Sequence, residues 1–571
     1  MSEVRERYSV KWTSALTAAA LMALAVIALH LPRAFLSLPL YSSDEGSYLL
    51  RALYGDMLQA DPQHAPFVAN VDNVVFFWII RLFGLLPGLF GLDALRIGGG
   101  LAYVLGLVLV WRVVAPRLNR GEALGLILLA LIYPYYRFVF TALPEGWYVA
   151  LLGGMILLTA RLWRPRPLLH AAAFGAMAAA LVLIKPHGLA VMCAGPALVV
   201  ADLILQRGRG PALAVLRLVI MAAAFLATGH LLRVIESHEL PRQLSFFGQG
   251  FYAQILDQPP AADATRIALT AHYAMTMTVL LLAGPAIALG LDDLLRRVRD
   301  KAFALQGTDL AFLLTLGAFA ATICMVSIFA FKMSFAVSET YRLWGRYFEF
   351  FIPLLWLTAW PAIRRREDLR DRRLLAAGTC LAGLVGLTIA LREAITLFPW
   401  DVAALHAFSL PTARYAGSTF PSFALAVVAM LGAIVLMLRR APMLQVWQGA
   451  FFILALLAIG QDGAWLSQLV PDRRGLAAEI QAIDKTTRQH PGRIIAFVED
   501  ANTHHNLFYG LHGRPRMVLV DPGASVQPKA AAGYGYIVLQ AGHPLYGLGW
   551  RPVYQGLRFT VFAPTGPMAK P

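Results

Sequence analysis

The chain has 571 residues, of which 58% are hydrophobic and 14% charged, and its mean hydropathy is +0.62. These values exclude an ordinary soluble enzyme and are typical of proteins that cross a membrane many times. The net charge of +16 does not indicate nucleic-acid binding, because the basic residues cluster between hydrophobic segments. Cys193, Cys324 and Cys380 lie far apart in apolar runs, so neither a disulfide nor a cysteine metal site is expected.

The distribution of basic residues predicts how the chain threads through the membrane. A cytoplasmic N-terminus places nearly every basic cluster on the cytoplasmic side, where Lys and Arg are enriched. At roughly 20 apolar residues per crossing, the chain forms about 13 spans. They cover about residues 13–31, 95–114, 123–140, 146–162, 168–184, 189–205, 213–231, 270–289, 310–331, 348–362, 374–391, 422–438 and 446–460. The sequence thus predicts an all-α polytopic protein of the bacterial inner (plasma) membrane.

Residues 41–59, which follow the first span, are expected to form a helix on the outer surface of the membrane. Apolar residues recur at helical spacing and share one face of this helix, at Leu49, Leu50, Leu53, Tyr54, Met57 and Leu58. Polar residues occupy the other face, so the helix should lie along the bilayer rather than cross it. Residues 73–90 are apolar but interrupted by Arg81 and Pro87, and are predicted to form a second interfacial helix, with a full membrane crossing as the less favoured alternative.

Two adjacent carboxylates, Asp44 and Glu45, stand in the first turn of the first interfacial helix. Unpaired backbone N–H groups favour negative charge at this position. Ser42 and Glu45 have the spacing of a capping box, in which Glu45 would reach back to the Ser42 N–H. Glu45 is therefore either a helix cap or a member of a catalytic pair. Asp44 has no such structural role, and a carboxylate held at the membrane surface is a candidate general base.

Further polar residues collect at the outer ends of the predicted spans. Lys185 and Arg346 are cations on the outer side, where the distribution of basic residues disfavours them. Arg offers a planar fork and Lys a point charge for phosphate oxygens, although each alone also fits a span end. A base, cations and a hydrophobic bundle together suggest transfer of a group from a lipid phosphate to an acceptor hydroxyl. The candidate donor-binding residues are Lys185, Arg346, Arg342, His187, His64, Glu145, Tyr48 and Tyr347.

A divalent cation is compatible with the sequence but not required by it. Asp44, Glu45 and Glu145 offer the oxygen ligands that such cations prefer. The sequence contains no P-loop, no glycine-rich dinucleotide motif after a strand and no zinc motif.

The composition changes after the last span, which divides the chain into a membrane domain at 1–465 and a small domain at 466–571. The small domain is predicted to be α/β and to lie outside the membrane, in the periplasm or its equivalent. Its expected elements are an amphipathic helix at Leu476–Ile483 and strands at Arg493–Glu499, Met517–Val520, Tyr536–Gln540 and Arg558–Phe562. His504, His505 and His512 lack metal-ligand spacing and are expected at the surface.

In these motifs the chain resembles the GT-C glycosyltransferases, such as the dolichyl-phosphate-mannose protein mannosyltransferases and the bacterial aminoarabinose transferase of lipid A. The order of the motifs is more specific than any one of them. They are the Asp-Glu pair of the first loop, His64-Ala-Pro66, Arg81-Leu-Phe-Gly84, Leu95-Arg-Ile97, Lys185-Pro-x-Gly188 and Gly345-Arg-Tyr347 before the span with Pro353.

The resemblance implies an inverting glycosyltransferase that uses a polyprenyl-phosphate sugar, with a hydroxyl of a glycolipid, polysaccharide or protein as acceptor. It implies that Asp44 is the general base and that Lys185 and Arg346 bind the donor phosphate. The family has His-Pro-Pro where this chain has His-Ala-Pro, so the role of His64 stays open. The alternative is a lipid or solute transporter. Internal repeats that mark many transporters are not recognisable between the two halves of the sequence.

We expect the residues beyond Asp472 to lie on the opposite side of the membrane from the basic loop at Arg364–Arg373, because the basic residues and the odd number of spans place them so. Fusions of alkaline phosphatase should be active after Asp472 and inactive in the loop, and fusions of a cytoplasmic fluorescent reporter should behave in the opposite way. The same reporter active at both positions would contradict this topology.

Overall fold

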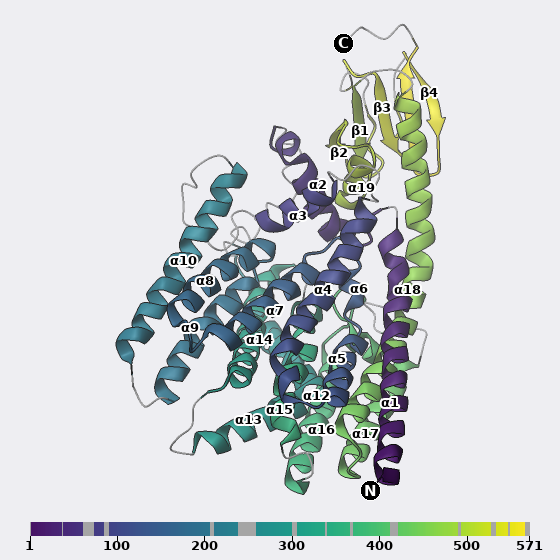
Figure 1. The fold of residues 1–571 in the computed structure, drawn as a ribbon. Helices are drawn as coiled ribbons and strands as arrows, with labels where there is room; N and C mark the ends of the chain where they lie inside the picture. Colours follow the sequence, from purple (N-terminus) through teal and green to yellow (C-terminus); the bar gives the residue numbers. More distant parts are fainter. Residues whose placement is uncertain are drawn as a thin grey trace.

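The computed structural model consists of a helical bundle with a small sheet domain at one end, which we call the domain end of the bundle (Figure 1). It describes residues 2–36, 38–60, 73–84, 91–205, 210–237, 258–299, 305–336, 340–365, 369–411, 421–488, 493–526, 531, 533–545 and 549–565. Within these ranges the bundle packs around one continuous apolar core.

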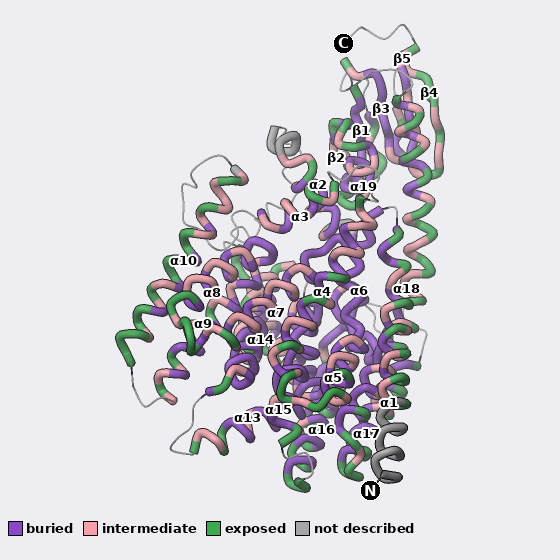
Figure 2. Tube along the Cα trace, in the orientation of Figure 1, coloured by how far each residue is buried: buried purple, intermediate pink, exposed green. Residues whose placement is uncertain are grey.

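Eight helices of the described chain are long and apolar enough to cross a membrane. They are α1 (Ser2–His30), α4 (Leu92–Val114), α8 (Pro167–Ile184), α9 (Gly188–Leu205), α10 (Pro211–Ser237), α14 (Gly307–Lys332), α16 (Arg370–Glu393) and α18 (Met443–Arg488). Exposed apolar side chains on α10, such as Val219 and Ile235, form the kind of surface that lipid covers, whereas buried residues fill the interior of the bundle (Figure 2). The prediction of an all-α polytopic membrane protein is confirmed.

The remaining helices are shorter or broken. They are α2 (Ser42–Ala60), α3 (Val74–Gly84), α5 (Arg120–Ile132), α6 (Tyr136–Val139), α7 (Glu145–Leu162), α12 (Ala264–Leu282), α13 (Gly284–Val298), α15 (Phe351–Arg364) and α17 (Ser422–Leu438). Short 3-10 segments are η1 (Leu31–Phe35), η3 (Ala115–Arg117), η4 (Met333–Phe335), η6 (Gly345–Tyr347) and η7 (Ala404–Phe408).

Every predicted span coincides with helical structure, but two of them are not single helices. The span predicted at 270–289 is bent by 78° between α12 and α13, where Pro285 has no N–H to continue the hydrogen bonding of α12. The span predicted at 123–140 ends as α5 at Ile132, because the residue before Pro134 is driven out of the helical conformation. By length and composition alone, eight helices of the described residues qualify as spans, or nine spans if the bent pair is counted as one. The other predicted spans coincide with shorter or less apolar helices, so the number of about 13 stays a prediction.

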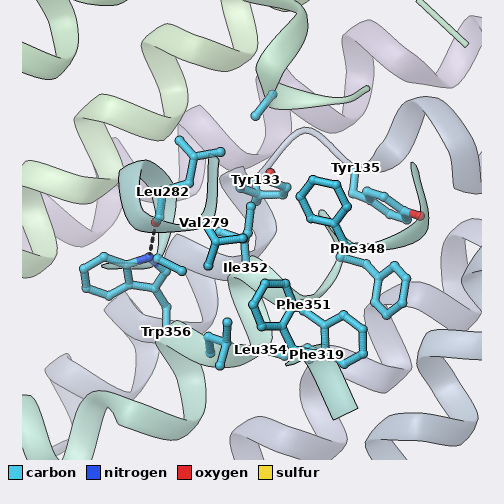
Figure 3. Close-up of a cluster of buried hydrophobic side chains, with 14 of the residues drawn as sticks. Tyr133, Tyr135, Val279, Leu282, Phe319, Phe348, Phe351, Ile352, Leu354 and Trp356 are labelled. Atoms are coloured by element: carbon cyan, nitrogen blue, oxygen red, sulfur yellow. Dashed lines mark hydrogen bonds between the residues drawn. The ribbon is translucent and has the colours of Figure 1, made fainter. Parts of the chain in front are cut away.

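Helix α15 lies at the centre of the bundle. All of its residues from Phe351 to Ile363 are buried, as is typical of a helix that is apolar on every side. Figure 3 shows part of this core, in which Trp356 donates a 2.8 Å hydrogen bond to the carbonyl of Leu282. Because α15 follows directly after Arg346, this packing holds the predicted donor-binding segment in place.

The two helices predicted on the membrane surface are present as α2 and α3. Leu49 packs among residues of α3, whereas Leu50 belongs to the core of the small domain. Helix α2 is kinked at Tyr54, whose backbone has φ −132° and ψ 22°. Helix α2 therefore lies between α3 and the small domain at the domain end of the bundle (Figure 1).

The small domain has a five-stranded sheet in the order β2-β1-β3-β5-β4. The strands are β1 (Ile494–Val498), β2 (Pro515–Leu519), β3 (Tyr536–Gln540), β4 (Trp550–Gln555) and β5 (Phe559–Pro564), with α19 (Ala501–Gly510) after β1. Strand β1 is parallel to β2 and β3, and β5 is antiparallel to β3. The four predicted strands are present. Strand β4 was not predicted, because it is a mostly exposed edge strand that contains Pro552.

Helix α18 joins the bundle to the small domain without a linker. It is 46 residues long, and the boundary predicted at residue 465 falls inside it. Its second half carries the predicted amphipathic helix, whose Leu476, Ile480 and Ile483 are buried in the core of the small domain. The small domain is therefore joined to the bundle by a helix that runs through both, with Pro471 inside it.

The prediction of surface histidines holds for His512 but is wrong for His504 and His505. Both are buried, because α19 is enclosed between the small domain and α2. A sequence pattern within α19 alone does not reveal that α2 covers it.

Candidate active site

Asp44 lies in the first turn of α2 and faces the bundle. Its Oδ2 forms a 2.6 Å ion pair with Nη1 of Arg346, and 40% of its side chain is exposed. Burial acts to raise the pKa of Asp44, but the charge and hydrogen bond of Arg346, with Arg342 and Lys185, hold the pKa below its ordinary value. Asp44 is therefore ionised at neutral pH and accessible to a second molecule.

Glu45 is adjacent in sequence but is turned into the protein. Its side chain is 0% exposed, and Oε1 accepts backbone N–H groups of Leu40 at 3.0 Å and Tyr41 at 2.9 Å. Oε2 accepts the N–H of Ala142 at 2.8 Å and a charged hydrogen bond from Arg96 at 3.2 Å. Glu45 therefore accepts the backbone N–H groups that lie just before α2, while the predicted hydrogen bond from the Ser42 N–H stays a prediction. We propose a structural role for Glu45 in place of the catalytic one predicted for it.

Glu145 and Lys185 come from two neighbouring helices. Glu145 begins α7, where the helix N-terminus favours a carboxylate, and Lys185 follows the last residue of α8. Nζ of Lys185 donates a 2.7 Å hydrogen bond to Oε1 of Glu145, and both side chains are buried. Oε2 of Glu145 is also buried but accepts no hydrogen bond within the described part of the chain.

Arg346 joins these groups into one site. In addition to Asp44, its Nε lies 3.3 Å from Oε1 of Glu145, and its Nη2 donates to the hydroxyl of Tyr347 at 3.1 Å. Burial opposes the charge of Arg346, but Tyr347, Asp44 and Glu145 outweigh burial and raise its pKa well above the ordinary value. Arg346 is therefore a permanent cation that bridges α2 and α7.

Tyr347 and His187 form an aromatic layer beside the cations. Their rings stack at a centroid distance of 4.4 Å and an angle of 9°, and Nζ of Lys185 lies 4.4 Å from the ring centroid of Tyr347. Burial lowers the pKa of His187 well below its ordinary value, and Lys185 and Arg346 add to this effect. His187 is therefore neutral and acts as a flat surface rather than as a third cation.

Burial also lowers the pKa of Lys185 to about 8, with Glu145 opposing that shift only in part. Lys185 is thus still protonated at neutral pH but loses its charge in mildly alkaline solution. The site combines two cations and two carboxylates, so an added anion is not excluded by a surplus of negative charge.

The loop that carries Arg346 is fixed by residues that sequence analysis did not single out. Arg342 donates to both carboxylate oxygens of Asp401, at 2.6 Å from Nε, and the Asp401 carbonyl accepts the N–H of Arg346. Tyr135 donates a 2.5 Å hydrogen bond to the carbonyl of Arg346. Asp401 lies within the short apolar run Phe398–Leu405, and a carboxylate among apolar residues is the sequence signal that could have marked it.

The structure brings together six of the predicted site residues: Asp44, Glu145, Lys185, His187, Arg346 and Tyr347. Arg342 lies next to them but is held by Asp401, which fits a loop-fixing role better than donor binding. Tyr48 lies one turn after Asp44 and packs edge-on against Phe76 at 5.4 Å. His64 lies outside the described residues.

The carboxylates weighed as cation ligands are not gathered around one point. Glu45 is paired with Arg96, while Asp44 and Glu145 are both engaged by Arg346. No group of three or more His, Cys, Asp or Glu in the described ranges is placed to hold a metal ion. A site of this kind would first require Arg346 to move.

No protein-family model and no curated protein matches the chain. Among solved structures, it is similar to ArnT from Cupriavidus metallidurans in the apo state, with a TM-score of 0.53 and 17% identity over 99% of this chain and 100% of ArnT. The same protein bound to undecaprenyl phosphate gives a TM-score of 0.52 and 18% identity, over 98% of this chain and 99% of ArnT. The arabinosyltransferase EmbB from Mycobacterium smegmatis matches with a TM-score of 0.41 and 15% identity, over 94% of this chain and 45% of EmbB. The predicted GT-C fold is confirmed by the likeness to ArnT.

The structural role of Glu45 leads to a prediction about stability. Glu45→Ala should lower the free energy of unfolding by about 3–5 kcal/mol, because it leaves the buried guanidinium of Arg96 without its carboxylate. Glu45→Gln keeps one oxygen to accept the N–H groups of Leu40 and Tyr41 but turns its NH2 toward the N–H donors of Ala142 and Arg96, and should cost roughly 1–3 kcal/mol. The measurement is chemical denaturation in detergent micelles.

Glu122 provides the matched control, since it closes a capping box with Asn119 at the start of α5 and pairs at 3.0 Å with Arg364, whose side chain is 39% exposed rather than buried. Loss of this cap in Glu122→Ala should cost about 1 kcal/mol. If the Glu45→Ala protein is as stable as the Glu122→Ala control, the ion pair between Glu45 and Arg96 does not hold the first turn of α2.

Proposed function

We propose that the chain is a glycosyltransferase that moves a sugar from a polyprenyl-phosphate donor to a hydroxyl of a glycolipid, polysaccharide or protein. The transfer takes place at the domain end of the bundle, on the outer face of the membrane. The observation that carries this proposal is the site itself, in which Arg346 links an accessible carboxylate to a buried Glu145–Lys185 pair. ArnT, which has the same fold, has been crystallised with undecaprenyl phosphate.

The cations Arg346 and Lys185 would bind the donor phosphate. Both are buried beside the aromatic layer of Tyr347 and His187, where a charged hydrogen bond to phosphate is stronger than in water. Of the two carboxylates on Arg346, Asp44 is 40% exposed and Glu145 only 1%, so the phosphate takes the place of Asp44 on the guanidinium. The open Oε2 of Glu145 can accept a hydrogen bond from a sugar hydroxyl.

The proposed chemistry follows from this exchange. Once phosphate replaces Asp44 on Arg346, Asp44 loses the partner that lowers its pKa and becomes a stronger base. Asp44 then accepts the proton of the acceptor hydroxyl as the hydroxyl oxygen bonds to the anomeric carbon of the sugar. The bond from that carbon to the phosphate oxygen breaks on the opposite face, which inverts the configuration, and Arg346 and Lys185 stabilise the leaving phosphate.

The transporter alternative has one feature in its favour, the bent pair α12–α13. Broken helices of transporters line a site near the middle of the membrane. Here α13 lies at the end of the bundle opposite to the small domain and to α2 (Figure 1). Purified protein that transfers label from radiolabelled polyprenyl-phosphate sugars to an acceptor would establish the enzyme. Reconstituted protein that moves a lipid or solute across vesicles without transferring label would establish the transporter.

Asp44→Asn tests the general base. The amide retains the size of the carboxylate but cannot accept the proton, so the rate of transfer should fall by about 10²–10⁴. Donor binding should persist, because Arg346 and Lys185 are unchanged. Asp93→Asn, which alters a carboxylate in the first turn of α4, is the matched control and should keep the wild-type rate. An Asp44→Asn protein with the wild-type rate would remove Asp44 from the mechanism.

Lys185 should give donor binding a pH limit. Its pKa of about 8 means that the affinity for undecaprenyl phosphate should fall as pH rises above 8, by about tenfold per pH unit if the neutral amine does not bind. Lys185→Arg should abolish this dependence, because a guanidinium stays charged in that range. Arg346→Lys should weaken binding at every pH, because the planar fork is lost. The measurement is equilibrium binding between pH 7 and 9.5, and a pH dependence that persists in Lys185→Arg would exclude Lys185 as the titrating group.

A further inference from the structure

We propose that the small domain positions the general base, Asp44. Helix α19 fixes the position of Asp44 because His505 packs closely against the backbone at Gly46. The proposal rests on the proposed function for the role of Asp44, but the contact and its effect on Asp44 can be tested without an activity assay.

The small domain shares its core with α2. Leu50 of α2 and Leu38, which precedes it, are buried in the same cluster as Leu507 and Phe508 of α19. Tyr54 also meets the ring of Phe508 edge to face, at a centroid distance of 5.5 Å. Figure 1 shows α2 and α19 side by side at the domain end of the bundle. The helix that carries Asp44 is thus part of the hydrophobic core of the small domain.

Gly46 makes the closest approach between the two helices. A Cβ atom added to Gly46 would lie 2.9 Å from Cβ of His505, a distance that neighbouring atoms do not tolerate. The conflicting atom is a Cβ, which cannot swing away like the end of a long side chain. His505 is itself buried, so α19 cannot yield toward solvent. Only glycine lets α2 lie this close to α19.

The first turn of α2 is consequently held from two sides. Glu45 ties it to the bundle through Arg96 and the N–H of Ala142. At Gly46 this turn packs closely against the small domain, which is joined to the bundle by helix α18. Asp44 precedes both contacts and meets Arg346 at 2.6 Å. The placement of the small domain therefore determines how Asp44 lies relative to Arg346.

Gly46→Ala tests this positioning role. The added methyl group pushes α2 away from α19 and should lower kcat about 10²-fold, the cost of a misplacement of roughly 1 Å. The KM for the donor should change much less. His505→Gly removes the opposing Cβ, so the double variant should recover most of the lost kcat. Gly55→Ala is the matched control on the same helix, because a Cβ there meets nothing within 4 Å, and it should keep the wild-type kcat.

A thiol at position 44 reports the same geometry without any activity. In a chain whose Cys193, Cys324 and Cys380 are replaced by alanine, the thiol of Asp44→Cys should have a lowered pKa, because Arg346 stabilises the thiolate. Adding Gly46→Ala should raise this pKa, and adding His505→Gly as well should lower it again. The pKa of the thiol in each variant is measured from the pH dependence of its alkylation rate.

The two readouts separate the two proposals. A wild-type protein that transfers no sugar, together with the expected thiol shifts, would overturn the glycosyltransferase and leave the positioning role intact. Gly46→Ala with an unchanged kcat and an unchanged thiol pKa would overturn the positioning role. If the Gly46→Ala protein does not accumulate, Phe508→Ala replaces it, because this change removes the ring packed on Tyr54. Phe508→Ala should lower kcat and raise the pKa of the thiol at position 44. An unchanged kcat and an unchanged thiol pKa would overturn the positioning role.

Discussion

The arrangement of the candidate site depends on the guanidinium of Arg346. A buried cation must be compensated by nearby charge and hydrogen bonds, because the cost of removing it from water is several kcal/mol. Arg346 meets this requirement with carboxylates from two different helices, Asp44 of α2 and Glu145 of α7. The central helix α15 follows the arginine and is buried on every side, so the position of the cation is set by the core of the bundle. The start of the surface helix α2 is tied to the bundle by this interaction together with the contacts of Glu45 to Arg96 and the Ala142 N–H.

Buried cations that are compensated by nearby carboxylates also occur in the parts of the bundle that support the site. Arg96 fastens the turn before α2, since it donates to the carbonyls of Leu36 and Leu38 as well as to Glu45. A further buried group connects segments far apart in the sequence, with Asp462 of α18 paired to Arg33, Arg137 and His406. Removal of Glu45 would leave Arg96 without its carboxylate, and removal of Asp462 would leave Arg33 and Arg137 without theirs, so these carboxylates help to define which segments meet.

The small domain contacts the helix that carries Asp44, although the two lie far apart in the sequence. It is joined to the bundle by α18 and contacts α2 through α19, so it is attached at two points rather than suspended on a linker. The apolar residues of α2 are divided between two neighbours, with Leu49 toward α3 and Leu50 toward the small domain. Helix α2, which was expected to lie along the bilayer, packs between two protein surfaces.

The sequence by itself determined the class of protein, the approximate positions of the helices and four of five strands, and it named six polar residues that the folded chain brings together. Hydrophobic segments and basic clusters are local in the chain, and cations on the unfavoured side of a membrane stand out for electrostatic reasons. The tertiary structure decided what depends on partners distant in sequence. Asp44 and Glu45 have the same chemistry, and only the folded chain shows that one faces Arg346 and the other is buried against Arg96. Arg342 was indistinguishable from Arg346 until Asp401 was found to hold it. Gly46 carried no signal at all, because a close approach between two helices is a property of neither helix alone.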